Sequence, residues 1–137
     1  MRSLAVLATA ATAAAVSLAV STPAAATPAM WKWRAVHSAD GMAAAWGEVA
    51  VHQFGHVVDG KLEDTRGKGC AWAVLRSQDS RNGRWRDHGF YNCVPGVGTF
   101  RKDYRDTRQV RVQVCRGTAK RPTGECSPWK TLLRPGQ

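Results

Sequence analysis

The stretch QVRVQVC at residues 109–115 alternates valine with polar residues, and this alternation limits the possible folds more than any other feature of the chain. Successive side chains of a β-strand point to opposite faces, so the three valines share one face while Arg111, Gln113 and Cys115 share the other. The pattern predicts a strand whose valines fill a core and whose arginine faces water.

Other short runs also have strand character and are separated by turn residues. Asn82-Gly83 is a favoured hairpin dipeptide, and Asp59-Gly60 is expected to form a turn. The run GMAAAW, residues 41–46, is short and ends at Gly47, so we expect a loop or a single helical turn there. Besides the alternating stretch, the expected strands are 31–36, 47–54, 57–58, 70–76, 84–93, 99–104 and 129–133.

About seven short strands with turn residues between them are typical of an all-β fold. We therefore predict a single antiparallel β-sandwich, immunoglobulin-like or a small barrel, over residues 27–137.

The first 26 residues have the features of a secretory signal peptide. Arg2 gives a basic start, residues 4–20 carry no charge, and Ala24-Ala25-Ala26 offers small residues for cleavage before Thr27. The uncharged run is diluted by alanine and threonine, whereas a membrane span needs roughly 20 strongly apolar residues. We expect cleavage after Ala26, secretion of one mature domain, and no membrane span in the mature form.

The chain carries 20 basic and 10 acidic residues, a formal net charge of +10. Arg2 is the only basic residue before Thr27, so removal of residues 1–26 leaves a net charge of +9. The excess lies in residues 66–137, which hold 16 basic and 5 acidic residues. Such a charge favours anionic partners such as nucleic acid, wall polymer, acidic polysaccharide or anionic lipid, although it also serves solubility alone.

Four cysteines in a small exported domain indicate two disulfides, and they lack the spacing of a zinc site. Strand parity places Cys70 on the face of Trp72, which we expect to point inward, and Cys115 on an outward face. Cys93 is expected to share the inward environment of Cys70. The predicted bridges are therefore Cys70–Cys93 and Cys115–Cys126.

The stretch GKGCAWAVLRSQDSRNGRWRDHGFYNCVPGVGTF, together with VRVQVCRG and CSPW, resembles small secreted basic proteins of actinobacteria, a loose family without an assigned function. The V-x-V-x-V strand, the hairpin after it and the Ser-Pro-Trp opening also resemble the last two strands of immunoglobulin-like and fibronectin type III sandwiches. The resemblance implies a secreted β domain and brings no catalytic residue.

The leading hypothesis is a non-catalytic binding or structural domain whose partner is an anionic polymer, either wall polymer or nucleic acid. Cations on an exposed sheet face would bind polyphosphate mainly through counterion release. The candidate residues, all expected to face solvent, are Arg84, Arg86, Arg111, Arg116 and Lys130.

A second hypothesis is a small nuclease or other hydrolase that uses Glu48 and a histidine as acid and base. Glu48 and His52 share a strand face, whereas His52 and His56 would lie roughly 13 Å apart on an extended strand, too far for one metal ion. No serine or cysteine has the setting of a nucleophile. We therefore predict no catalytic residue, no metal and no cofactor.

A third hypothesis is an inhibitor or toxin-like module that presents the loop 117–125, with Lys120 and Arg121 near its apex. Ordering by a disulfide would reduce the entropy lost on binding. Among the tryptophans, Trp72 and Trp85 are expected in the core. Trp31, Trp33 and Trp129 are expected either to stack on sugars or bases or to pack at the edge of the sandwich.

Overall fold

The structure is a computed structural model that describes residues 13–21, 29–65 and 68–137. These residues contain nine strands and no helix, which confirms the predicted all-β class. Residues 13–21 are exposed and have no regular structure, while the expected cleavage position after Ala26 lies outside the described residues. Within the described ranges, no helix is long and apolar enough to cross a membrane.

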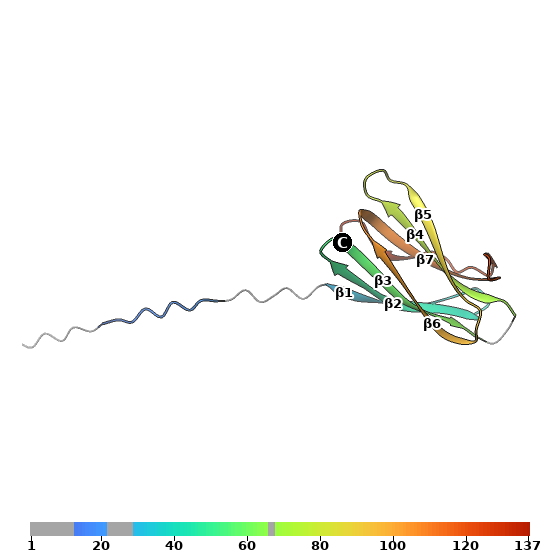
Figure 1. Ribbon diagram of the computed structural model, residues 1–137, viewed down its shortest axis with the longest axis horizontal. Coiled ribbons are helices and arrows are strands. Elements are labelled where there is room, and N and C mark those ends of the chain that lie inside the picture. The colour runs from blue at the N-terminus through green and yellow to red at the C-terminus, as the bar shows by residue number, and fades with distance from the viewer. Residues whose placement is uncertain (1–12, 22–28, 66–67) are drawn as a thin grey trace, which may run out of the picture.

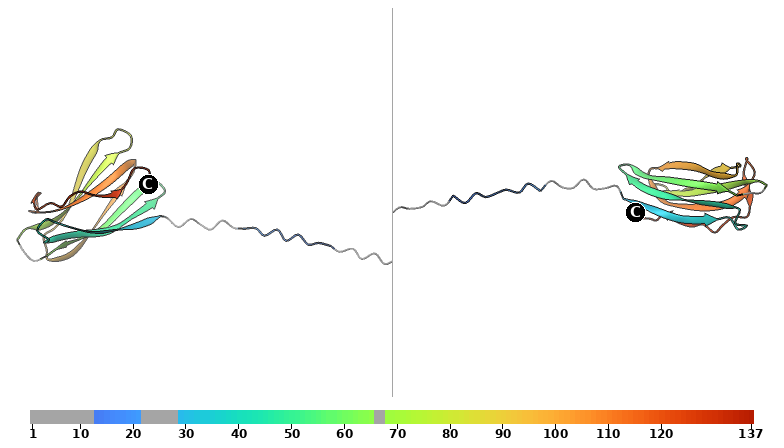
Figure 2. Two further views of the ribbon diagram at one scale, coloured as in Figure 1. Left: turned by 180° about the vertical axis from the view of Figure 1, so that it is seen from behind. Right: turned by 90° about the horizontal axis from the view of Figure 1, so that it is seen from below.

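Two antiparallel sheets pack face to face as a sandwich (Figure 1). The first sheet has the order β1 (Met30–His37), β2 (Ala43–His52), β3 (Gly55–Asp64), β6 (Gly96–Tyr104). The second has the order β5 (Trp85–Asn92), β4 (Cys70–Asp79), β7 (Thr107–Gly117), β8 (Pro122–Gly124), and β9 (Lys130–Leu133) also pairs with β7. The two sheets diverge toward the β4–β5 turn, as the view from behind also shows (Figure 2).

The core lies between the sheets and is built by alternation. Val110, Val112 and Val114 of β7 are fully buried, as the sequence predicts, and Ala73 and Leu75 of β4 join them. Each fully buried valine or leucine side chain contributes about 1.5–3 kcal/mol relative to an exposed one. The alternating stretch is therefore the centre of the hydrophobic core.

Gly60 lies in the middle of β3, so the expected turn at Asp59-Gly60 is wrong. Gly60 pairs with Phe100 on β6 and with Gly47 on β2. A Cβ on Gly60 would overlap the Phe100 ring. The glycine is therefore explained by the close approach of an aromatic ring, not by a turn.

The run 41–46 is also not a loop or helical turn, because β2 begins at Ala43. Ala43 and Ala45 are fully buried, and the Ala43 backbone N–H is bound by Ser38 Oγ at 3.0 Å. Small side chains here let the two sheets approach, and pairing with β3 overrides the weak strand propensity of alanine.

Both predicted disulfides, Cys70–Cys93 and Cys115–Cys126, are present. The inward environment expected for Cys70 and Cys93 is wrong, however, because Cys70 packs with Trp72 and Cys115 in a cluster separate from the main core, on the outward face predicted for Cys115. The neighbouring residue Ala71 is the one that belongs to the main core. The bridges therefore lie on the outer face of the second sheet, and neither joins the two sheets.

Trp72 is covered on that outer face by its own neighbours. Its ring lies 5.1 Å from the ring of Tyr91, and a Cβ on Gly89 would come within 2.7 Å of it. Its Nε1 donates to Thr118 O at 2.7 Å. Trp72 is thus buried, as predicted, but in a small second core with the cysteines.

Candidate anion-binding cleft

The five predicted polyanion-binding residues do not form one patch. Arg84 and Arg86 lie at the start of β5, Arg111 lies on the outer face of β7, and Lys130 begins β9. Lys130 Nζ is 3.4 Å from Arg34 O. The structure brings only the first two of these cations to a common site.

Arg116 does not face solvent, so its predicted exposure is wrong. It is only 9% exposed, and its Nη1 donates to Asp64 Oδ1 at 2.7 Å. The physical reason is strand alternation, since position 116 falls on the inward face shared by Val112 and Val114. This cation is neutralised inside the sandwich.

Arg111 belongs to a row of stacked cations on the outer face of the second sheet. Its guanidinium lies 4.9 Å from the ring centre of Trp85, and Arg76 lies 4.3 Å from that of Trp129. Arg76 also donates two hydrogen bonds to Asp87, at 2.8 and 2.9 Å. Trp85 is 42% exposed, so its predicted place in the core is wrong.

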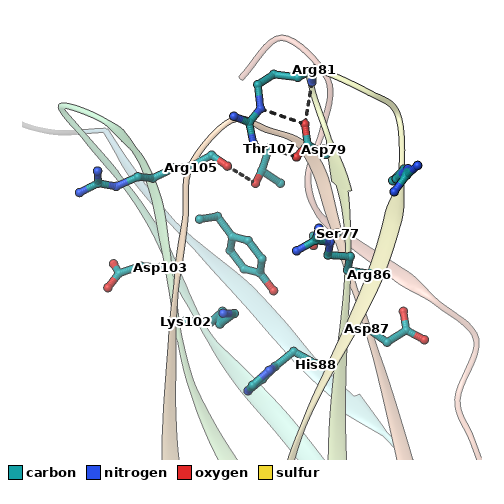
Figure 3. Close-up of a pocket in the computed structure, with 12 residues that line it drawn as sticks. Ser77, Asp79, Arg81, Arg86, Asp87, His88, Lys102, Asp103, Arg105 and Thr107 are labelled. Atoms are coloured by element: carbon teal, nitrogen blue, oxygen red, sulfur yellow. Dashed lines mark hydrogen bonds and ion pairs between the residues drawn. The ribbon is translucent and has the colours of Figure 1, made fainter.

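A second group of cations lines a cleft between the edge strands β5 and β6, where the sheets diverge (Figure 3). The cleft has a volume of about 380 Å³. Its basic lining residues are Arg81, Arg84, Arg86, Lys102 and Arg105, with His88 beside them. Figure 3 shows Arg86, Lys102 and His88 around the middle of the cleft, whereas Arg105 points away from it.

The cleft exists because the inward face of each edge strand changes from apolar to polar. Phe90 of β5 stacks on Phe100 of β6 at 4.9 Å and closes the narrow end of the seam between the sheets. Toward the β4–β5 turn, the inward positions become His88 and Arg86 on β5 and Lys102 on β6. The positively charged side chains on the two edge strands repel each other and stay hydrated, so the gap between the two sheets remains open there.

The acidic residues of the cleft already have partners. Asp79 accepts from Arg81 at 3.3 Å, Asp87 is held by Arg76, and Asp103 lies 3.9 Å from His52. A hydrogen bond from Arg81 lowers the pKa of Asp79, and one from Arg76 lowers the pKa of Asp87. Each of the three carboxylates therefore lies beside a basic side chain.

Besides Arg105, which points away, three cations of the cleft are left without an acidic partner among the described residues. Among the described residues, no ion pair involves Arg84, Arg86 or Lys102. Lys102 Nζ instead lies over the Tyr104 ring, 5.8 Å from its centre. The cleft therefore presents positive charge that nothing in the described chain neutralises.

Tyr104 forms part of the lining and is only 6% exposed. Burial raises the pKa of its phenol well above the ordinary value of 10, and the charge of Asp87 adds to the rise. Ser77 opposes the rise, yet the Tyr104 hydroxyl has no hydrogen-bond partner of good geometry within the described residues. The cleft thus holds a neutral donor whose one neighbouring hydroxyl, that of Ser77, lies outside good hydrogen-bond geometry.

The residues of the hydrolase hypothesis lie elsewhere, on the first sheet. Glu48 stands opposite Lys32 and Asp59, and no hydrogen bond or ion pair joins it to a histidine among the described residues. His52 and His56 flank the β2–β3 turn, so they do not lie on one extended strand. In the described ranges, no group of three histidine, cysteine or carboxylate side chains could hold a metal ion.

The loop 117–125 turns back sharply between β7 and β8. Thr118 N donates to Arg121 O at 3.0 Å, and Lys120 N donates to Thr118 Oγ1 at 3.2 Å. Lys120 and Arg121 are exposed at the apex, and Cys126 follows at its base. This is a compact turn, not an extended segment.

Sequence reasoning missed Arg81, Lys102 and Tyr104. A signal was present in TFRKDY, because Phe100, Lys102 and Tyr104 alternate on one face of β6.

No protein-family model, curated protein or solved structure matches the chain. The cleft must therefore be interpreted from its own chemistry.

Proposed function

We propose that this protein is a secreted, non-catalytic domain that binds an anionic polymer of the cell surface through the cleft between β5 and β6. The observation that carries the proposal is that Arg84, Arg86 and Lys102 line one cleft without an acidic partner among the described residues. The leader-like residues 1–26 and the two disulfides support secretion.

The geometry favours binding over surface solubility alone. Charges that serve only solubility are spread out, whereas these cations come from both sheets and converge on one concavity. A concave wall of low dielectric concentrates their field and attracts an anion more strongly than a flat surface does. Such a site would recognise the negative charges of the polymer and the spacing between them. Binding of this kind requires no catalytic residue.

The test is a titration of fluorescently labelled polyphosphate with the mature protein at several salt concentrations. Three neutralised cations predict a loss of affinity of roughly 20- to 40-fold between 50 and 200 mM salt. The double variant Arg86→Gln/Lys102→Gln should bind more weakly, and its salt dependence should be less steep by about one unit for each cation removed.

The matched control is Lys120→Gln/Arg121→Gln, which removes the same charge from the exposed β7–β8 turn. We expect this variant to bind nearly as well as the wild type. Equal losses for the two double variants would show that only net charge matters. Loss of inhibition of a trypsin-like protease in the control variant alone would support the inhibitor hypothesis in place of the cleft.

A further inference from the structure

We propose that the cleft recognises a phosphodiester group of a polymer without bases, and that the Tyr104 hydroxyl donates a hydrogen bond to a phosphate oxygen. This inference rests on the proposed function and adds the chemistry of the ligand. It assigns a role to the one buried donor of the cleft that has no partner among the described residues.

A buried hydroxyl without a partner is costly. Leaving such a group unsatisfied costs about 1–3 kcal/mol, and buried polar groups in folded proteins are rarely left so. The Tyr104 side chain also packs in the main core, so its position is fixed by its neighbours. A bound acceptor would satisfy the hydroxyl without moving the tyrosine.

The neighbours of Tyr104 favour a tetrahedral anion over a planar one. Arg86 comes from β5, Lys102 from β6 and Ser77 from β4, so the donors approach from three strands in two sheets. A carboxylate presents two oxygens in one plane, whereas a phosphodiester presents oxygens in several directions. Donors from opposite walls can therefore serve one phosphate together.

Lys102 links the charged wall to the hydroxyl. Its Nζ lies over the ring of Tyr104, so a phosphate paired with this ammonium group would also lie next to the tyrosine. Arg86 is exposed and forms no ion pair among the described residues. We infer that the two long side chains shift onto the incoming anion and open the path to the hydroxyl.

Among the described lining residues, His88 alone presents an exposed aromatic ring to a nucleobase, and that ring packs against Phe90 with 4.7 Å between ring centres. Base recognition on single strands relies on exposed aromatic faces. The aromatic side chains of this cleft are Tyr104, which is buried, and His88. A polymer such as poly(glycerol phosphate) offers all the groups that the cleft can contact.

The experiment compares three labelled polymers of equal length: poly(glycerol phosphate), polygalacturonate and single-stranded RNA. The variant is Tyr104→Phe, and its matched control is Tyr91→Phe, the other tyrosine of the chain, which is exposed on the outer face of β5. The phenylalanine variant removes a hydroxyl that has no partner to lose, so we expect its unfolding temperature to equal or exceed that of the wild type.

We expect wild-type protein to bind poly(glycerol phosphate) more tightly than polygalacturonate, and RNA no more tightly per phosphate. Tyr104→Phe should lose roughly tenfold or more in affinity for poly(glycerol phosphate), as removal of a hydrogen bond to a charged group does. Its salt dependence should not change, since no charge is removed. Tyr91→Phe should bind as the wild type does.

The outcomes separate the two proposals. Wild-type affinity of Tyr104→Phe for poly(glycerol phosphate), or an equal loss for polygalacturonate, would overturn the role of Tyr104 and leave polyanion binding intact. Tighter binding of RNA per phosphate would overturn the choice of a polymer without bases. Absence of binding to every polymer at low salt would overturn the proposed function itself.

A measurement on the wild-type protein gives an independent check. Because the chain has two tyrosines, the ring signals of Tyr104 and Tyr91 can be followed separately by NMR. Adding poly(glycerol phosphate) should shift the signals of Tyr104 and leave those of Tyr91 in place. An unchanged Tyr104 spectrum at saturation would contradict the assignment even if the phenylalanine variant failed to fold.

Discussion

Arg116 on β7 and Asp64 at the end of β3 form an ion pair between the two sheets, with 2.7 Å between Nη1 and Oδ1. Asp64 is 2% exposed, and Arg116 also donates to Lys68 O at 2.6 Å. Arg116 Nε also lies 3.7 Å from Asp40 Oδ2, so removal of Asp64 would leave the buried guanidinium with only this more distant and partly exposed carboxylate. We therefore expect Asp64→Ala to lower the free energy of unfolding by about 3–5 kcal/mol, measured by urea denaturation.

A hydrophobic replacement of the whole pair tests this explanation. Arg116→Met/Asp64→Leu should be more stable than either single variant, because the one carboxylate left without Arg116, that of Asp40, is partly exposed to water. Arg121→Met is the surface control and should change the free energy of unfolding by less than about 0.5 kcal/mol. A double variant as unstable as the sum of the single ones would mean that packing, not charge, dominates at this end of the sandwich.

His56 makes the fold sensitive to acid. Burial lowers its pKa from the ordinary value of 6.5, and the charge of His52 lowers it further. The unfolded chain thus binds a proton more readily than the folded one, so stability is complete above about pH 6.5 and falls as the pH drops below it. We expect a lower unfolding temperature at pH 5 than at pH 7.5.

The variant His56→Gln should lose less stability between these two pH values than the wild type does, because its side chain does not titrate. His37→Gln, at an exposed position at the end of β1, is the control. Calorimetric unfolding temperatures of the three proteins at both pH values decide the matter. Equal acid sensitivity in all three would place the titrating group elsewhere.

Gly60 gives a prediction about packing. A Cβ at this position would overlap the Phe100 ring, which in turn stacks on Phe90 and closes the narrow end of the cleft. Gly60→Ala should destabilise the fold by about 1–3 kcal/mol, as overpacking in a core commonly does. Gly124→Ala, where nothing lies within 4 Å of the added carbon, should change stability little. Denaturant unfolding of both variants measures the difference.

If the ring of Phe100 is the cause, a smaller side chain should relieve the overlap. Gly60→Ala/Phe100→Leu should then be less destabilised than the sum of its single variants. Strict additivity would show that the strain at position 60 comes from the backbone.

Local alternation predicts the centre of this fold because strand geometry alone determines it. It places Val110, Val112 and Val114 in the core, and the same rule, extended by one step, would have placed Arg116 beside them. The prediction that Cys70 and Trp72 point inward is wrong because both faces of β4 carry apolar side chains. The sequence does not show which of these two faces packs against the other sheet. The outer face carries its own small core.

The cleft could not be predicted from the sequence because it depends on which strands form the edges. Arg86 and Lys102 are 16 positions apart in sequence, and they face each other only because β5 and β6 end different sheets. Gly60 was misjudged for a similar reason, since the need for a glycine arises from Phe100 on a neighbouring strand. Long-range pairing, not local propensity, determines both features.

The two disulfides should contribute similar amounts of stability despite their different lengths. Cys70–Cys93 spans 23 positions and Cys115–Cys126 spans 11. In the chain-entropy model each bridge contributes about 3 kcal/mol, and doubling the loop adds only about 0.6 kcal/mol.

Replacement of either pair by alanine should therefore lower the free energy of unfolding by several kcal/mol in denaturant titrations. Cys70 and Cys115 are both buried beside Trp72, so loss of either bridge also removes packing, and the two losses should stay similar. Peptide mapping without reduction of the wild type serves as the control for the pairing, and a clearly larger loss for the longer bridge would show that loop length matters more than the model allows.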